Sequence, residues 1–208
     1  MTAEHTVRSV AALRELLSEP SAMVQAKLLT ALDHHMRAFI ALSPWVDVAS
    51  TGADGSVDLS PRGDPPGFVQ VLADGSLLIP ERPGNRRADT LRNIIETGGV
   101  GLSFVIPGRG ELLRVNGRAV VSQQPDWLAR LAHAGKAPQF AIHVQVQEAY
   151  LHCGRAVHRA QLWKPEAWPA PDALASMAQM LIDQTALPGL EVQALDGMLK
   201  KLVTEELY

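Results

Sequence analysis

The sequence lacks most of the features that mark the commoner kinds of chemical site. It contains one cysteine, Cys153, which excludes an intrachain disulfide framework and a zinc site built from several thiolates. Its seven histidines form no HExxH motif and no three-ligand spacing, and neither a GxSxG elbow nor a Walker loop occurs. We therefore expect no metal centre and no nucleophile elbow, and we expect Cys153 to be a buried or half-buried, inert thiol.

The sequence also has no excess of positive charge and no long apolar run. Its formal net charge is -3, so no general positive field is available to attract nucleic acid or anionic lipid. No stretch of about 18 to 20 apolar residues occurs, and the first ten residues mix charged and polar side chains instead of forming a signal peptide. We expect a cytoplasmic protein with neither a nucleic-acid nor a membrane partner.

What is present is an ordinary globular composition. The 208 residues are 47% hydrophobic and 20% charged, which is enough apolar material for one well-packed core. No internal repeat, low-complexity tract or break in composition marks a second unit. The chain is therefore predicted to form a single domain over residues 1–208.

Helical periodicity at the start of the chain gives way to short β-rich runs. Apolar residues recur at three- and four-residue spacing over residues 7–40, which predicts two amphipathic helices separated at Glu19 and Pro20. After Pro44, β-branched and aromatic residues predict strands over residues 45–50, 57–60, 68–72, 77–80, 100–106, 112–121 and 140–151. Further helices are predicted over residues 88–96, 126–134, 173–184 and 192–207.

Turn signals between these runs favour an antiparallel arrangement. Asp54-Gly55 and Asp74-Gly75 suit tight hairpins because glycine tolerates a positive φ. Six or seven antiparallel strands in a meander predict a mainly β, α+β protein built on a sandwich or barrel, since closure removes exposed sheet edges. The helices at both ends of the chain are expected to flank it.

The first candidate site lies at the end of the run that starts at residue 57. Arg62 beside the Ser60 hydroxyl offers donors to a phosphate group, and Gly63 lets the backbone approach a ligand. The structural alternative is a surface ion pair between Arg62 and Asp64 in a turn. The sequence leaves both interpretations open.

The second candidate site leads directly into the helix predicted from residue 88. It runs from Arg82 to Asp89 and includes Asn85, Arg86 and Arg87. Arginines before a helix N-terminus are unfavourable for the helix alone, because they lie near the positive end of its dipole, and a bound anion would offset this repulsion. The alternative is a solvated basic turn in which Asp89 offsets the helix dipole.

The third candidate site follows the last long strand. Arg159 and Trp163 together provide a guanidinium and an indole, which can stack on a flat aromatic cofactor. The alternative is that Trp163 fills the core while Arg159 forms a surface pair.

Taken together, these blocks resemble a known family. The order of residues in segments 54–68, 78–94 and 113–119 is similar to that of a branch of the pyridoxamine 5'-phosphate oxidase-like, FMN-binding split-barrel superfamily. Residues 37–40 resemble the entry to its first strand, and segments 148–153 and 159–163 resemble its closing block. The resemblance covers most of the chain.

The resemblance implies a six-stranded antiparallel split β-barrel that forms a homodimer with FMN at the subunit interface. The implied division is helices over residues 1–40, a barrel core over residues 41–163 and helices over residues 164–208. It also implies that Ser60 and Arg62 lie on the strand that lines the flavin and that Asn85, Arg86 and Arg87 lie where the phosphate is gripped, and we expect Gly63 and Asp89 to belong to the same cofactor site. Arg159 and Trp163 resemble the element that approaches the flavin ring from the partner subunit.

Three functions follow from this resemblance. The first is an FMN-dependent oxidoreductase that transfers hydride or electrons to or from a small planar substrate. The second is a non-catalytic flavin-binding or flavin-sensing protein. The third is a haem- or F420-binding relative, because the superfamily contains both and a fold does not determine a reaction.

Overall fold

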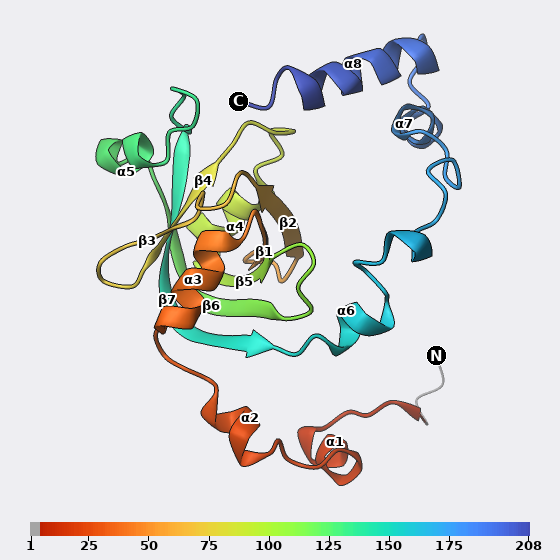
Figure 1. The fold of residues 1–208 in the computed structure, drawn as a ribbon. Coiled ribbons are helices and arrows are strands. Elements are labelled where there is room, and N and C mark those ends of the chain that lie inside the picture. Colours follow the sequence, from red (N-terminus) through yellow and green to blue (C-terminus); the bar gives the residue numbers. More distant parts are fainter. Residues whose placement is uncertain (1–4) are drawn as a thin grey trace.

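The computed structural model describes residues 5–208, so the first four residues of the predicted N-terminal region lie outside the described residues. One antiparallel sheet of seven strands forms its centre, in the order β2-β1-β5-β6-β7-β4-β3 (Figure 1). The strands are β1 (Trp45–Thr51), β2 (Val57–Gly63), β3 (Gln70–Val71), β4 (Leu77–Glu81), β5 (Gly99–Val105), β6 (Leu112–Ser122) and β7 (Phe140–His152).

The sheet confirms the predicted mainly β, α+β class and differs from the prediction in two respects. The resemblance implies six strands, and the seventh is the two-residue β3, which pairs only with β4. The predicted meander holds for β5, β6 and β7 and fails where β4 pairs with β7 instead of β5. A loop and a helix follow β4, and a connection of that length can carry the chain across the sheet, which a hairpin turn cannot do.

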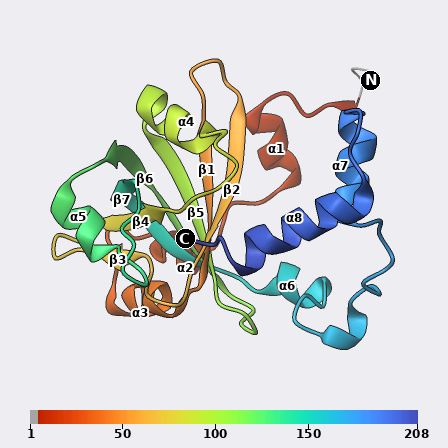
Figure 2. The same cartoon turned by 90° about the horizontal axis from the view of Figure 1, so that it is seen from above.

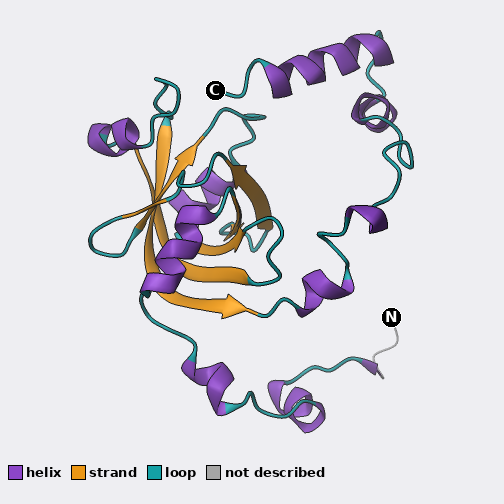
Figure 3. Cartoon of the chain, viewed as in Figure 1, coloured by secondary structure: helices purple, strands orange, loops and turns teal. Residues whose placement is uncertain are grey.

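The later predicted helices are present, three short helices replace the two expected near the N-terminus, and two short helices between residues 155 and 167 were not predicted. The helices are α1 (Val10–Leu16), α2 (Ala22–Ala26), α3 (His34–Leu42), α4 (Asp89–Thr97), α5 (Pro125–Arg130), α6 (Arg155–Arg159), the 3-10 helix η2 (Pro165–Ala167), α7 (Met177–Thr185) and α8 (Val192–Thr204). Figure 3 shows the strands gathered in one part of the molecule, with the helices of the two ends of the chain extending to one side of them.

Helix α3 connects the N-terminal region to the core. Its N-cap, Asp33, accepts a hydrogen bond from the Met36 N–H at 2.8 Å, which satisfies one of the free donors at the helix start. Met36, Phe39 and Ile40 are buried at three- and four-residue spacing. The amphipathic pattern read from the sequence therefore places this helix against the sheet.

The core fills the inside of the curled sheet. Along β1 and β5, alternate residues are buried, as expected for strands with one face in a core. Val46, Val48, Leu102 and Phe104 are among the most deeply buried side chains. Helix α4 packs against β1 and closes one side of this core.

Helices at both ends of the chain lie outside the sheet. Figure 2 shows α1, α6, α7 and α8 to one side of it. Helix α8 packs most closely against α7, with Leu195 and Ala178 buried. None of the helices within residues 5–208 combines the length and the apolarity that crossing a bilayer requires.

Candidate functional site

The main candidate site is a cleft where the ends of β2 and β4 come together. Because β2 is one edge of the sheet and β4 lies next to the other edge, the curl of the sheet brings them face to face along a seam. The cleft has a volume of about 700 Å³, within the usual range for small-molecule pockets. It is lined by the end of β2, the end of β4, the loop that follows β4, the start of α4, and Leu207 and Tyr208. We call it the seam cleft.

Two ion pairs join the strands across the seam. Arg62 at the end of β2 donates from Nε to Glu81 Oε2 of β4 at 2.9 Å, and its Nη2 lies at 2.9 Å from the same oxygen. Just beyond this pair, Arg82 Nε, one residue after Glu81, donates to Asp64 Oδ2, two residues after Arg62, at 2.7 Å. Both pairs are largely buried, with the Asp64 side chain only 1% exposed. The seam is therefore held by charge-assisted hydrogen bonds instead of a strand ladder.

These contacts decide one of the open alternatives. Arg62 does not pair with Asp64, since each has taken its partner from the opposite strand. Arg62 Nη1 also donates to Ser60 Oγ at 2.6 Å, which orients the guanidinium within the cleft. Most of the donors of Arg62 are therefore committed to the protein, and its first role is to hold the seam.

The start of α4 forms the second wall of the seam cleft. Its N-cap is Ala88, which has a left-handed backbone with φ 58° and provides no side-chain cap for the helix N–H groups. Arg86 also has a positive φ, of 60°. A left-handed conformation at a residue other than glycine costs about 1 to 2 kcal/mol, and such strain concentrates at functional sites. The start of α4 therefore has N–H donors without a side-chain cap, and Ala88, Asp89 and Thr90 line the cleft.

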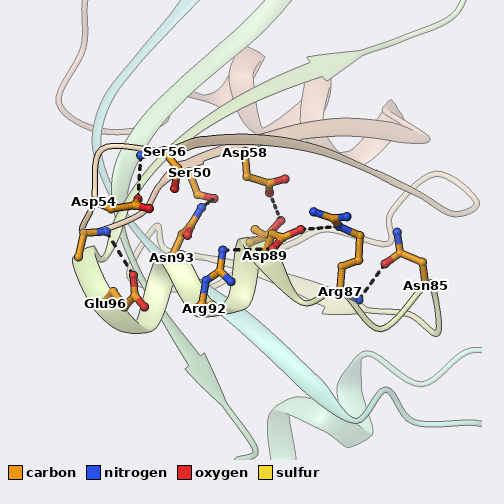
Figure 4. Close-up of polar contacts among 12 residues, drawn as sticks. Ser50, Asp54, Ser56, Asp58, Asn85, Arg87, Asp89, Arg92, Asn93 and Glu96 are labelled. Atoms are coloured by element: carbon orange, nitrogen blue, oxygen red, sulfur yellow. Dashed lines mark hydrogen bonds and ion pairs between the residues drawn. The ribbon is translucent and has the colours of Figure 1, made fainter. Parts of the chain in front are cut away.

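Arg87 lines the cleft at this helix start and keeps free donors. Its Nε donates to Asp89 Oδ2 at 2.8 Å, and its N–H donates to the Asn85 side chain (Figure 4). Its side chain is 74% exposed, and within residues 5–208 its terminal nitrogens donate to no other group. Arg87 can therefore bind an anion without giving up its contact with Asp89.

Asp89 is bound by two arginines. The hydrogen bond from Arg87 lowers the pKa of Asp89 below its ordinary value, although burial acts in the opposite direction. Arg92 lies one turn further along α4, with Nη2 at 3.2 Å from Asp89 Oδ1. The alternative interpretation of this segment is a basic turn in which Asp89 offsets the helix dipole. Asp89 does lie in the first turn of α4, where its negative charge is favourable, and it is paired there with both Arg87 and Arg92.

Helix α4 is fixed to the two neighbouring strands by polar contacts. Thr90 Oγ1 donates to Asp58 Oδ2 of β2 at 2.6 Å, and the buried Asn93 donates from Nδ2 to Ser50 Oγ of β1 at 3.1 Å (Figure 4). Both contacts lie on the face of α4 that meets the sheet. The helix start is therefore held in a fixed position relative to the cleft.

The charges around the cleft are nearly balanced. The lining guanidiniums belong to Arg62, Arg82 and Arg87, and the lining carboxylates belong to Asp58, Asp64, Glu81 and Asp89. Three of these carboxylates are paired with an arginine, and Asp58 accepts from Thr90. Anion binding in the cleft therefore depends on the free donors of Arg87 and of the helix start, not on an overall positive charge.

The structure brings together six of the nine residues predicted for the site. The cleft is lined by Ser60, Arg62, Gly63, Asn85, Arg87 and Asp89. Arg86 lies in a neighbouring groove of about 1240 Å³, which also has Leu91, Phe140 and Leu202 in its wall. The sequence missed Glu81 and Tyr208, because their contacts with Arg62 and Asp64 depend on the curl of the sheet.

Arg159 and Trp163 lie away from the seam cleft of their own chain. Arg159 is exposed at the end of α6. Trp163 is half-buried, and its indole N–H donates to the Arg109 carbonyl at 2.6 Å, on the loop between β5 and β6. Trp163 therefore does not fill the core, and a role of this pair at the flavin of a partner subunit stays a prediction.

The cysteine prediction was wrong about burial. Cys153 is exposed at the end of β7, and a hydrogen bond with Arg155 lowers the pKa of its thiol. The exposure arises because Cys153 follows the last residue of β7, where the chain leaves the sheet. Within residues 5–208 no group of three His, Cys, Asp or Glu side chains is arranged to hold a metal ion.

A serine in the turn before β4 meets a histidine of β7 without forming an activated nucleophile. His143 Nε2 lies 2.9 Å from Ser76 Oγ, but the serine hydroxyl donates to Asp74 Oδ1 at 2.6 Å. The hydroxyl proton therefore points to the carboxylate, and the histidine must donate to the serine instead of removing its proton. Ser76 is also fully buried. This cluster stabilises the hairpin turn before β4.

Comparison with known proteins identifies the central part of the chain. The family model described as pyridoxamine 5'-phosphate oxidase matches residues 32–153, which is more than half of the chain. This match includes the whole sheet and the start of α4. No curated protein matches the sequence.

Several solved structures are similar at low sequence identity. HupZ from group A Streptococcus is 17% identical, with a TM-score of 0.48, and the match covers 58% of this chain and 93% of that one. HutZ from Vibrio cholerae, described as a haem storage protein, is 14% identical, with a TM-score of 0.42 and coverage of 59% and 94%. A protein named F420 reductase is 15% identical, with a TM-score of 0.41 and coverage of 58% and 98%.

Proposed function

The chain belongs to the pyridoxamine 5'-phosphate oxidase family, and we propose that it binds FMN in the seam cleft, with the phosphate at Arg87 and the start of α4. The family includes flavin-binding oxidoreductases, an F420 reductase and haem-binding proteins. We choose FMN among these ligands because its single terminal phosphate needs one compact set of donors, and Arg87 and the start of α4 provide such a set.

The observation that carries this proposal is the open side of Arg87 at an uncapped helix start. A phosphate accepts well from a guanidinium and from the free N–H groups of a helix N-terminus. Ala88 in place of a Ser or Asp cap leaves those groups without a side-chain partner. The left-handed backbone at Arg86 and Ala88 keeps this arrangement in place at a cost in stability.

The rest of the cleft supplies what the flavin and ribityl parts need. The Ser60 hydroxyl and the Asn85 amide provide polar contacts, and Phe68, Pro80 and Leu207 provide apolar ones. Arg62 contributes indirectly, because it holds β2 against β4 and thereby maintains the cleft. The protein's part is to bind and orient the cofactor.

We further propose an oxidoreductase active as a homodimer. When bound, FMN supplies hydride or electron transfer to or from a small planar substrate. Arg159 and Trp163 would meet the flavin of the partner subunit, as the resemblance implies, because neither lines the cleft of its own chain. Members of this family are commonly dimers, and gel filtration with light scattering tests the assembly here.

A non-catalytic flavin-binding protein is the second candidate, and one observation favours it. The part of the cleft wall that the structure describes contains no histidine, lysine or cysteine, so it offers no ready general base near neutral pH. Anaerobic mixing with NADH and NADPH separates the two candidates. Bleaching of the flavin band supports an oxidoreductase, and a stable oxidised spectrum supports a binding or sensing protein.

Equilibrium titration tests the binding site. Purified apoprotein is titrated with FMN, haem and F420 in parallel, following flavin fluorescence and the visible spectrum. Tight binding of FMN that is weakened by Arg87→Ala supports the proposal. Preferential binding of haem or F420, or FMN binding that Arg87→Ala leaves unchanged, contradicts it.

A further inference from the structure

Tyr208 is anchored at the rim of the seam cleft by contacts from several elements. Its hydroxyl donates to Asp64 at the end of β2. The Arg82 guanidinium lies 5.5 Å from the centre of its ring, and His133 stacks on the ring with centroids 4.6 Å apart. Lys136 Nζ donates to the main-chain oxygen of Tyr208 at 2.8 Å. These four contacts fix the position of both the ring and the main chain of Tyr208.

The contact with Asp64 completes the partners of a buried carboxylate. The Asp64 side chain is 1% exposed, so each of its oxygens needs a hydrogen bond from the protein. Arg82 Nε donates to Oδ2, and the Tyr208 hydroxyl donates to Oδ1. Loss of the phenol would leave Oδ1 without this partner in a buried position, which is costly.

Apart from residues that line the neighbouring groove, among them Leu202 and Val203, the segment that carries Tyr208 lies outside the sheet. Helix α8 packs most closely against α7, and Figure 1 shows both helices outside the sheet before the chain returns towards it. Met198, Leu202 and Val203 of α8 remain exposed. Tyr208 is therefore a point at which the C-terminal segment is fastened to the barrel.

Tyr208 and Leu207 also separate two cavities. Both residues line the seam cleft, and both line the neighbouring groove that contains Arg86 and Phe140. They share this wall with the end of β4, the loop after it and Ala88, so the Tyr208 side chain forms one part of the boundary between the cleft and the groove. The position of Tyr208 therefore contributes to how enclosed the seam cleft is on this side.

We propose that Tyr208 is the retaining residue of the seam cleft: it fastens the segment after α8 to Asp64 and Arg82, and a bound cofactor leaves when this contact opens. The inference rests on the proposed function only in taking FMN as the bound molecule. It assigns Tyr208 a positioning role, since it acts by closing the cleft and not by taking part in a reaction.

The experiment measures the dissociation rate of FMN from the full chain. Removing the hydroxyl in Tyr208→Phe loses one hydrogen bond to a charged group and is expected to speed dissociation about tenfold. Tyr208→Ala also removes the ring and is expected to speed it further, while the association rate changes less in both variants. Tyr150→Phe is the matched control, because Tyr150 lies on β7 and does not line the cleft.

Amide hydrogen exchange of residues 192–208 without ligand provides a second readout. Tyr208→Ala is expected to speed exchange across this segment, whereas Tyr150→Phe is expected to leave it unchanged. Unchanged FMN dissociation in both Tyr208 variants overturns the proposal even though the proposed function stands. If the wild-type protein binds no FMN, the proposed function fails, and exchange alone decides whether Tyr208 fastens the segment; unchanged exchange then overturns that role.

Discussion

Arg62 of β2 and Glu81 of β4 form an ion pair with Nε and Oε2 2.9 Å apart, although the two strands lie on opposite sides of the sheet order. The pair exists because the sheet curls until its first strand meets its sixth. The seam cleft occupies the same place, so the contacts that close the sheet also shape the candidate site. Changes at this pair should affect stability and ligand binding together.

Arg62→Ala should therefore destabilise the protein by about 2 kcal/mol, the scale of losing a hydrogen bond to a charged group and leaving its partner unpaired. The side chains of Arg62 and Glu81 are only 11% and 22% exposed, so solvent replaces the lost contact poorly. Glu81→Gln should cost a similar amount by leaving the guanidinium unpaired. Urea unfolding followed by circular dichroism measures both changes.

The double variant Arg62→Ala/Glu81→Gln tests whether the two side chains act as a pair. Its loss of stability should be clearly smaller than the sum of the single losses, because neither charge is then left alone. Strict additivity would show that the two residues stabilise the fold independently, against this account of the seam.

Arg87→Ala should weaken FMN binding about tenfold or more, because a phosphate contact with a guanidinium is lost. Arg86→Ala should have a much smaller effect, since Arg86 lies in the neighbouring groove. Arg14→Ala serves as the matched control: it removes an exposed, paired arginine on α1, away from the cleft. Fluorescence titration measures the FMN affinity of all three variants. A larger loss of affinity in Arg86→Ala than in Arg87→Ala would indicate that the phosphate binds in the neighbouring groove.

Gly117→Ala should destabilise the protein by about 3 kcal/mol, at the upper end of the cost of overpacking. Gly117 lies at the bulge of β6, where an added Cβ would be 2.2 Å from the Gln145 carbonyl oxygen of β7. Gly99→Ala on β5 is the matched control, since no atom lies within 4 Å of its added Cβ. Equal thermal stability of the two variants would contradict the described register of β6 and β7.

The Tyr208 hydroxyl should titrate above its ordinary pKa of 10.0, because its hydrogen bond to Asp64 favours the protonated phenol, as does burial. A raised pKa in the folded state means that this contact contributes fully at neutral pH and is lost as the pH rises through the raised value. The protein has two tyrosines, so the absorbance difference between wild type and Tyr208→Phe isolates one of them. Titration at or below pH 10 would contradict the contact with Asp64.

Most of the secondary structure could be predicted from local patterns. The seven β-rich runs correspond to the seven strands, and the helix before Gly98 begins within one residue of its predicted start at residue 88. The pairing of β4 with β7 could not be predicted, because Leu77 and Val144 are brought together by the curl of the whole sheet. Local periodicity carries no information on such pairings.

In the candidate site, too, residues with a local sequence signal could be predicted, and residues whose contacts depend on the fold could not. The sequence identified Arg87 and Asp89 because an arginine before a helix start conflicts with the helix dipole. It did not identify Tyr208, which lies 144 residues from Asp64 and has no local pattern around it. It also could not show that Arg62 is committed to Glu81, a contact that turns a predicted ligand-binding residue into one that mainly holds the seam.

The most direct test of the central claim is the visible spectrum of the purified protein with its ligand released by denaturation and identified by mass. The account predicts an oxidised flavin spectrum, FMN as the released molecule, and a strong loss of bound FMN in Arg87→Ala but not in Arg14→Ala. A colourless protein with no FMN affinity at about the micromolar level, or a haem or F420 spectrum in place of flavin, would contradict it.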